Sequence, residues 1–171
     1  MTPAIETTRL LLLPLQPEDA AEMAAVLADP ALYTFIGGSP PAVDELDARY
    51  RGWLLGAPRA SEDWHNWVIR LLDGGAAVGH LQATVIGSPD AIADIAWVVG
   101  TPWQGRGYAT EAAMALVDWL ESSGVGAITA HVHPENTGSR RVAARAGLEA
   151  TDEVVDGEVI WRRERHTSGD A

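Results

Sequence analysis

The alternation of apolar and polar positions predicts an ordered series of strands and helices along the chain. An apolar run at residues 9–15 indicates a strand, and residues 16–30 carry helix-start and helix-stop signals, with Pro17 at one end and Pro30 at the other. Residues 43–56 have apolar side chains at helical spacing, which indicates a second, amphipathic helix. The pattern therefore begins with one strand followed by two helices.

The middle of the chain is typical of strands joined by short turns. Strands are predicted over 65–73, 77–86 and 92–100, with turns at 74–75 and 87–90. Consecutive strands joined in this way form an antiparallel meander.

The clearest helix signal follows the meander. Apolar residues recur at i, i+3, i+4, i+7, i+8 and i+11 from Ala109 to Leu120, and the stripe ends before Gly124. The preceding strand ends near Gly100, so a glycine-bearing loop leads into a helix that begins near Tyr108.

The C-terminal part adds a strand, a helix and a hairpin. The strand is predicted at 127–133, the short helix at 136–147, and the hairpin at 153–164 with its turn at Asp156 and Gly157. The whole order of elements indicates a mixed α and β fold.

The composition is that of one globular domain. Of 171 residues, 47% are apolar, which is enough to build a core. We expect this domain to span residues 1–165 and the tail at 166–171 to fray. No apolar run approaches the roughly 20 residues that span a bilayer, and the first residues do not resemble a secretory signal. We therefore expect a cytoplasmic protein.

Two residue types are missing from the chain. All twelve basic residues are arginine, so there is no lysine, and there is no cysteine. The absence of cysteine excludes disulfides, thiolate metal sites and a cysteine nucleophile. We expect no metal site.

The net charge of -12 favours cationic partners and disfavours nucleic acid and anionic membranes. The charge is unevenly distributed, because residues 104–147 carry four acidic groups and four arginines while the rest of the chain is net negative. An anionic ligand could be tolerated in that stretch. A soluble surface with uneven local balance explains the same distribution.

The loop before the alanine-rich helix is a candidate phosphate site. A strand, a glycine-bearing turn and a helix start leave several backbone N–H groups free to bind an anion. A Walker loop needs a lysine, which this chain lacks. A dinucleotide fingerprint needs a third small residue and an acid at the end of the next strand, where this chain has His131 and His133.

The sequence QGRGYA at 104–109 resembles the pyrophosphate-binding signature of GNAT acetyltransferases: Gln or Arg, two variable residues, Gly, one variable residue, then Gly or Ala. The run at 133–149 resembles the second half of the same coenzyme site, and the order of elements matches over nearly the whole chain. TTRLLLLPLQPEDA at 7–20 and PENTGS at 134–139 resemble the branch that includes ribosomal-protein N-terminal acetyltransferases.

The resemblance implies an α+β fold, with a central, mostly antiparallel twisted sheet of six to seven strands flanked by about four helices. It also implies acetyl-CoA as the acetyl donor. Its phosphates would be bound by backbone N–H groups, and Gln104, at the first position of the signature, would belong to the same site. The N–H groups are those of Gly105, Arg106, Gly107, Tyr108, Ala109 and Thr110. A solvated turn residue is the alternative role for Arg106.

The resemblance further implies that the strand before the loop diverges from its neighbour, so that pantetheine pairs with the backbone of Trp97, Val98 and Val99. A backbone N–H near Val98 would stabilise the oxyanion. Asn136 would hold the pantetheine arm, and Ser139 would help protonate the thiolate.

A purely structural role remains open for the second half of the site. Asn and Ser are common helix caps, so Asn136 could simply cap a helix. One of three nearby arginines would meet the adenosine phosphate, and we include Arg145 in the candidate site, with Arg140 and Arg141 as alternatives.

The candidate general base is Asp94. Strict alternation in the strand places it on one face with Ile92, Ala96 and Val98, and an acid among apolar neighbours is costly unless it is paired or functional. A strand-end hydrogen bond is the structural alternative. The histidines at 65, 80, 131 and 133 are alternative bases.

The implied reaction is acetyl transfer to a primary amine, either a protein N-terminus or a small amine, with Asp94 and Ser139 as catalytic residues. Without cysteine, direct attack in a ternary complex is the expected route. A non-catalytic GNAT-like module that binds acyl-CoA or a partner is the alternative, and a nucleotide oxidoreductase is an unrelated third class. The sequence leaves the acceptor and a homodimer open.

Overall fold

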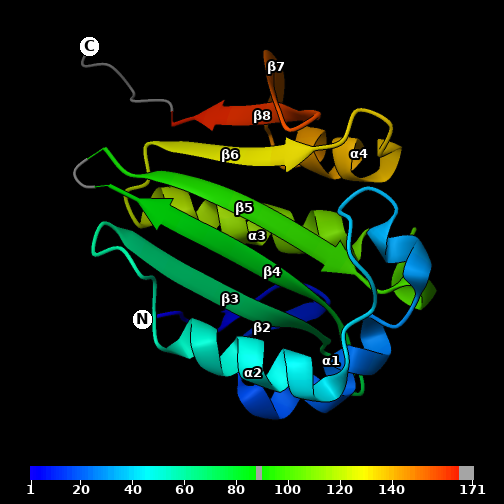
Figure 1. The fold of residues 1–171 in the computed structure, drawn as a ribbon. Helices are drawn as coiled ribbons and strands as arrows, with labels where there is room; N and C mark the ends of the chain where they lie inside the picture. Colours follow the sequence, from blue (N-terminus) through cyan, green and yellow to red (C-terminus); the bar gives the residue numbers. More distant parts are fainter. Residues whose placement is uncertain (88–89, 166–171) are drawn as a thin grey trace.

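A single mixed sheet organises the chain. The computed structural model describes residues 1–87 and 90–165 (Figure 1). The sheet has eight strands in the order β1-β2-β3-β4-β5-β6-β8-β7, and only the β5–β6 pair is parallel. The strands are β1 Ile5–Glu6, β2 Leu10–Pro14, β3 Glu62–Leu71, β4 Ala77–Ile86, β5 Ile92–Val99, β6 Ala127–Val132, β7 Glu149–Val155 and β8 Glu158–Glu164.

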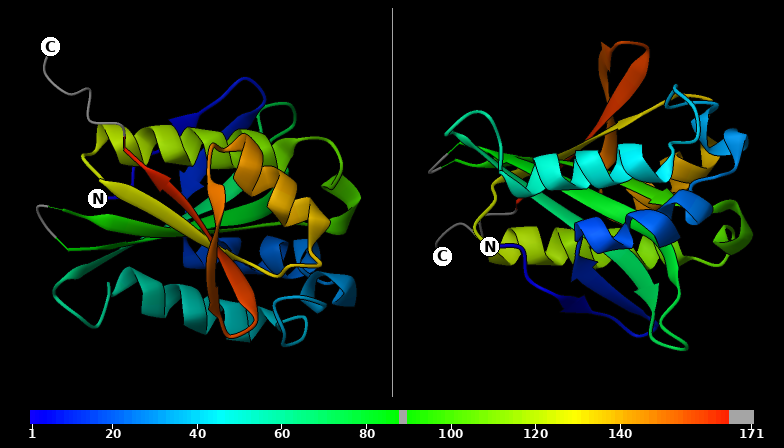
Figure 2. Two further views of the ribbon diagram at one scale, coloured as in Figure 1. Left: turned by 90° about the horizontal axis from the view of Figure 1, so that it is seen from above. Right: turned by 60° about the horizontal axis from the view of Figure 1, so that its bottom comes forward.

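Four α-helices cover the two faces of the sheet within the described residues. They are α1 Ala20–Val26, α2 Val43–Leu54, α3 Tyr108–Ser122 and α4 Thr137–Arg145, and short 3₁₀ turns occur at η1 Pro17–Asp19, η2 Pro30–Tyr33 and η3 Thr101–Trp103. Seen from above, α3 lies on one side of the sheet and α1 and α2 lie on the other (Figure 2). In the described ranges no helix combines the length and apolar character needed to cross a membrane.

The two faces carry separate hydrophobic cores, as the period of two in the strands requires. Trp67 on β3 packs with the α3 stripe, whereas its neighbour Val68 packs with α1 and α2. Leu116 and Leu120 of α3 are fully buried. Burying each such side chain contributes about 1.5–3 kcal/mol, which holds the start of α3 in a fixed position under the sheet.

The predicted mixed, mostly antiparallel sheet and the four helices are confirmed, and the strand count is one higher than the upper expectation of seven. The extra strand is β1, whose two residues are too short to show a periodic pattern. The first predicted helix, at 16–30, is divided between η1 and α1. The expectation of a frayed tail at 166–171 lies outside the described residues.

The strands β5 and β6 pair over three positions and then separate. Ile92, Ala93 and Asp94 pair with Ala127, Ile128 and Thr129, and no later residue of β5 has a partner on β6. The two strands diverge toward their carboxyl ends in Figure 1. We call the opening between residues 95–99 of β5 and the end of β6 the β5–β6 gap.

The β7–β8 hairpin extends toward the side of the sheet that carries α2 (Figure 2). Its turn lies at Asp156 and Gly157, with φ of 51° and 84°, as the Asp-Gly sequence predicts for a two-residue turn. The hairpin and α2 therefore stand on either side of the sheet face onto which Asp94 projects.

Candidate active site

The loop between β5 and α3 presents free backbone donors. Gly105 and Gly107 have φ of 74° and 82°, and Gly107 is the N-cap of α3. Only glycine adopts such angles without strain. Within residues 1–87 and 90–165, no protein group accepts a hydrogen bond from the N–H groups of residues 105–110. These donors and the positive end of the α3 dipole have the geometry of a candidate anion site.

Gln104 attaches this loop to the end of β5. Its side-chain Nε2 donates a hydrogen bond to the carbonyl of Val99 over 2.9 Å. This bond joins the loop to the end of the strand. The Gln104 side chain thus points back to β5 and links the loop to this strand.

The backbone groups of β5 alternate between its two neighbours. The Ala93 carbonyl faces β6, because Thr129 Oγ1 contacts it at 3.5 Å, and Gly100 N–H faces β4, because it donates to Val78 O at 2.8 Å. Alternation between these two points directs the backbone of Trp97 and Val99 into the β5–β6 gap. The backbone of Val98 is directed toward β4, and its side chain packs with the α1–α2 core.

Asn136 and Ser139 lie together at the start of α4. Asn136 is the N-cap, and its Oδ1 accepts a hydrogen bond from Ser139 N–H over 3.0 Å. Asn136 therefore caps α4, as the structural alternative from the sequence predicts. The capping hydrogen bond uses the amide oxygen of Asn136, and the donor Nδ2 has no acceptor among the residues that the structure describes.

The three candidate arginines occupy different parts of α4. Arg140 Nη1 donates to Pro134 O at 3.3 Å and stabilises the loop before the helix. Arg141 and Arg145 are one turn apart and exposed. Arg145 is the last residue of α4, so it lies at the opposite end of the helix from Asn136.

Asp94 is the last residue of β5 that pairs with β6, so it lies where the β5–β6 gap begins. Its Oδ1 accepts a hydrogen bond from Thr129 Oγ1 at 2.9 Å and lies 3.6 Å from His131 Nε2. Burial raises the pKa of Asp94, and the Thr129 hydrogen bond and the His131 charge oppose this rise. A carboxylate with a raised pKa is a better proton acceptor than an ordinary aspartate.

The four candidate histidines have distinct surroundings. His131 lies between two acids, with Nδ1 3.9 Å from Glu158 Oε2 on β8. His133 contacts the Phe35 ring at 5.1 Å between centroids. His65 lies on the α3 face, where it meets Trp119, so it is on the opposite side from Asp94.

His80 lies on β4, opposite Val98 of β5. Burial lowers the pKa of His80 to about 4. A histidine with this pKa is neutral at pH 7 but weakly basic. Of the titratable groups weighed from the sequence, the pKa shifts therefore favour Asp94 over His80 as the proton acceptor.

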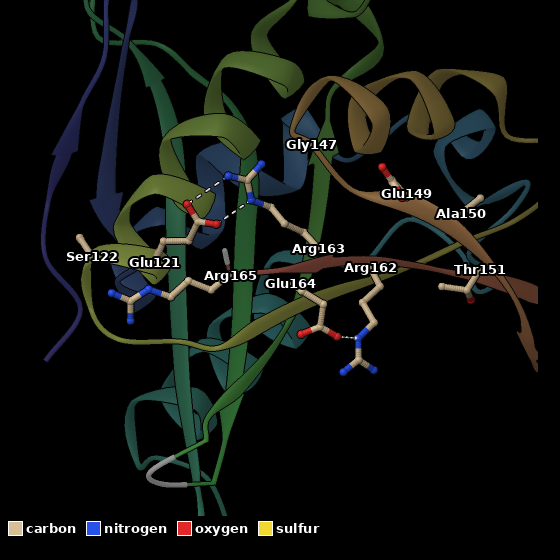
Figure 3. A pocket seen from close by; sticks show the side chains of 10 residues that line it. All are labelled: Glu121, Ser122, Gly147, Glu149, Ala150, Thr151, Arg162, Arg163, Glu164 and Arg165. Atoms are coloured by element: carbon tan, nitrogen blue, oxygen red, sulfur yellow. Dashed lines mark hydrogen bonds and ion pairs between the residues drawn. The ribbon is translucent and has the colours of Figure 1, made fainter. Parts of the chain in front are cut away.

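A cavity in the described part of the chain is away from these residues. It has a volume of about 780 Å³ and lies between the end of α3 and the start of β7 (Figure 3). Two of its arginines already have partners, since Arg163 binds Glu121 and Arg162 binds Glu164. None of the predicted site residues lines it.

Sequence reasoning missed three residues that surround the site: Thr129, Arg9 and Glu111. Thr129 is paired with Asp94 only because β5 and β6 are adjacent in the sheet. Arg9 and Glu111 are in contact although 102 residues separate them, and no local pattern indicates such a pair.

Comparison with known proteins agrees with this geometry. A family model described as an acetyltransferase (GNAT) domain matches residues 9–149. The chain therefore belongs to the GNAT acetyltransferase family. A search of curated proteins gave no match.

Solved structures share the fold over nearly the whole chain. A GNAT-family acetyltransferase from Bacillus anthracis superposes with a TM-score of 0.78 at 20% identity, covering 95% of this chain and 98% of that one. RimL, a ribosomal L7/L12 alpha-N-protein acetyltransferase in complex with coenzyme A, gives 0.75 at 17% identity, covering 95% and 98%. AAC(6')-Ib in complex with paromomycin and acetyl-CoA gives 0.75 at 22% identity, covering 95% and 99%.

Proposed function

We propose that the protein is an acetyl-CoA-dependent N-acetyltransferase that transfers an acetyl group to a primary amine by direct attack in a ternary complex. One observation carries the proposal. The β5–β6 gap opens at Asp94 and leads, along the free edge of β5, to a loop whose N–H groups have no hydrogen-bond acceptor among the described residues.

The coenzyme site would extend along this path. The loop from Gly105 to Thr110 would bind the diphosphate through its N–H groups, and the backbone of Trp97 and Val99 would pair with the pantetheine amides. Asn136 Nδ2 lies at the start of α4 and could donate to the same arm. Two similar structures, RimL and AAC(6')-Ib, contain coenzyme A and acetyl-CoA respectively, which supports this assignment.

Asp94 would accept the proton of the amine, directly or through water. Its raised pKa and its place at the start of the gap support that role. Bringing a lysine-type amine with a pKa of about 10.4 to its neutral form at pH 7 costs roughly 4–5 kcal/mol, whereas an α-amino group near 7.7–8.0 costs about 1 kcal/mol. The task of the base is therefore much lighter for a terminal amine.

The oxyanion and the thiolate need donors at the far end of the gap. A backbone N–H of β5 near Val98 would stabilise the oxyanion, and Ser139 would supply a hydroxyl near the sulfur. The acceptor would enter on the sheet face between α2 and the β7–β8 hairpin. Asp94 and Glu158 make this face favourable for a cation.

A thiol-release assay with acetyl-CoA and a panel of amines tests the proposal. The panel contains N-terminal peptides, polyamines, aminoglycosides and amino acids. We expect thiol release with at least one amine. We also expect Gly107→Glu to abolish coenzyme binding, because it adds a carboxylate and a side chain at a residue with φ of 82°.

Gly124→Glu is the matched control, because Gly124 ends the same helix region with φ of 92° and open space around it. It should lose stability to a similar extent and still bind coenzyme A. Coenzyme binding without thiol release from any amine would instead support the non-catalytic module. A wild-type protein that coenzyme A does not stabilise against heat would contradict the assignment of the site.

A further inference from the structure

Arg9, the residue just before β2, contacts the back of the proposed coenzyme loop. Its Nε donates to Glu111 Oε2 at 2.7 Å, its backbone N–H donates to Glu111 Oε1 at 2.8 Å, and its Nη1 donates to the Arg106 carbonyl at 3.0 Å. The guanidinium also lies over the Tyr108 ring, 4.7 Å from its centroid. One side chain thus reaches the loop, the first residue of α3 and the first-turn acid of that helix.

Glu111 is held firmly enough to anchor this arrangement. Thr7 Oγ1 adds a third hydrogen bond to the carboxylate, at 2.7 Å. Burial by itself would raise the pKa of Glu111, but the hydrogen bonds from Thr7 and Arg9 outweigh it, and the pKa lies below its ordinary value. The carboxylate is therefore charged at neutral pH.

The contact with the Arg106 carbonyl sets the direction of a neighbouring donor. That carbonyl and the N–H of Gly107 belong to one planar trans peptide, so they point in opposite directions. Arg9 holds the oxygen on the β2 side, and the Gly107 N–H must therefore point away from Arg9. A β-carbon at Gly107 would lie 3.4 Å from Arg9 Nη2, so Arg9 fills the space directly behind this residue.

Charge makes the same arrangement necessary. An uncompensated Glu111 in the first turn of α3 would repel an anion at the start of the helix. Arg9 compensates that charge at hydrogen-bond distance. Glu111 in turn fixes the guanidinium in the orientation that reaches Arg106.

We propose that Arg9, fixed by Glu111, is a positioning residue for the coenzyme diphosphate, because it aims the Gly107 N–H at the ligand. The proposal rests on the coenzyme site proposed above and adds to it a residue that directly precedes β2. The affinity for coenzyme A would then depend on the hydrogen bond from Arg9 to the Arg106 carbonyl, although Arg9 itself does not contact the ligand.

The test measures dissociation constants for coenzyme A and for pantetheine, which has no diphosphate, by calorimetry on the full chain. We expect Arg9→Gln to weaken coenzyme A binding about ten-fold and to leave pantetheine binding unchanged. Arg9→Lys keeps the charge but cannot bind Glu111 and the Arg106 carbonyl together, and we expect it to bind as weakly as Arg9→Gln.

The double variant Arg9→Gln/Glu111→Gln separates the orientation of the Gly107 N–H from the effect of the Glu111 charge. We expect its affinity for coenzyme A to remain low. The uncompensated Glu111 charge is gone, but the peptide between Arg106 and Gly107 is no longer held by Arg9. Recovery of wild-type affinity in the double variant, or full affinity in Arg9→Lys, would overturn the positioning role.

Arg51→Gln is the matched control, since Arg51 forms an exposed ion pair with Asp47 on α2 at 2.8 Å. It should bind coenzyme A as the wild type does. Melting temperatures identify any variant that fails to fold. If Arg9→Gln does not fold, the affinity of Arg9→Lys for coenzyme A decides whether Arg9 has the positioning role. Failure of the wild type to bind coenzyme A would contradict the proposed function, whereas wild-type binding with unaffected Arg9 variants would contradict only this inference.

Discussion

Thr129 Oγ1 donates a hydrogen bond to Asp94 Oδ1 over 2.9 Å at the last position where β5 and β6 pair. Beyond this point the strands separate, and the free edge of β5 leads to the loop before α3. The bond therefore fixes the proposed base at the vertex of the gap, with one carboxylate oxygen held and His131 beside it.

Asp94→Asn should lower activity and raise stability. Burial raises the pKa of Asp94, so the charged form that exists at neutral pH is disfavoured in the folded chain. Asparagine keeps the acceptor for Thr129 without the charge. We expect kcat to fall about 10²–10⁴-fold, as for loss of a general base, and the melting temperature to rise.

The control for this variant is Asp63→Asn, which changes an exposed aspartate on β3 and should leave both quantities unchanged. A full-activity Asp94→Asn enzyme would show that another group accepts the proton. His131 would then be the first residue to examine, because its Nε2 is 3.6 Å from the same oxygen.

Gln104→Ala should weaken coenzyme binding without unfolding the protein. The variant removes the hydrogen bond between Gln104 Nε2 and Val99 O, which joins the loop to β5. A hydrogen bond of this kind contributes about 0.5–1.5 kcal/mol. We expect the dissociation constant for coenzyme A to rise by about three- to ten-fold, measured by calorimetry.

Gln16→Ala provides the comparison, because Gln16 Nε2 donates to a backbone carbonyl, that of Pro14, at 3.3 Å and far from the loop. Its affinity for coenzyme A should match the wild type. Equal weakening in both variants would mean that Gln104 acts only through general stability.

Much of the candidate site could be proposed from the sequence because its signals are local. The loop 104–109 and the alanine stripe of α3 are consecutive in sequence, and alternation alone placed Asp94 and Val98 on one face of β5. The neighbours of these residues come from distant segments. The Arg9–Glu111 contact joins the segment before β2 to α3, and the gap arises from the register of two parallel strands, which no periodicity encodes.

Gly79→Ala should disturb the free edge of β5 from the opposite side. A β-carbon at Gly79 on β4 would overlap the carbonyl oxygen of Val98 and lie 3.0 Å from Val99 Cα. Overpacking of this kind costs about 1–3 kcal/mol, and here the strand that must move carries the gap. A glycine inside a strand pattern is a sequence signal for such close approach.

We expect Gly79→Ala to lower the free energy of unfolding and to weaken coenzyme binding together. Gly52→Ala is its control, because Gly52 lies within α2 and has no atom within 4 Å of the added carbon. That change should stabilise the protein by up to about 1 kcal/mol. Normal coenzyme affinity in Gly79→Ala would show that the gap does not depend on the β4–β5 contact.

His80 should make the protein lose stability as the pH falls below about 6.5. Burial lowers its pKa to about 4, with the nearby Arg49 charge acting in the same direction, while the unfolded chain keeps the ordinary value. Between these two values the unfolded state binds the proton and the folded state does not. Stability is therefore complete above pH 6.5 and falls toward pH 4, by about 3 kcal/mol in total.

Denaturant unfolding at pH 7, 6 and 5 measures this loss. His65 contributes in the same direction, since burial also lowers its pKa. His80→Gln should therefore flatten the profile in part, and the double variant with His65→Gln should flatten it further. A slope unchanged in His80→Gln would mean that His80 is accessible to protons in the folded chain, and it would return His80 to the set of candidate bases beside Val98.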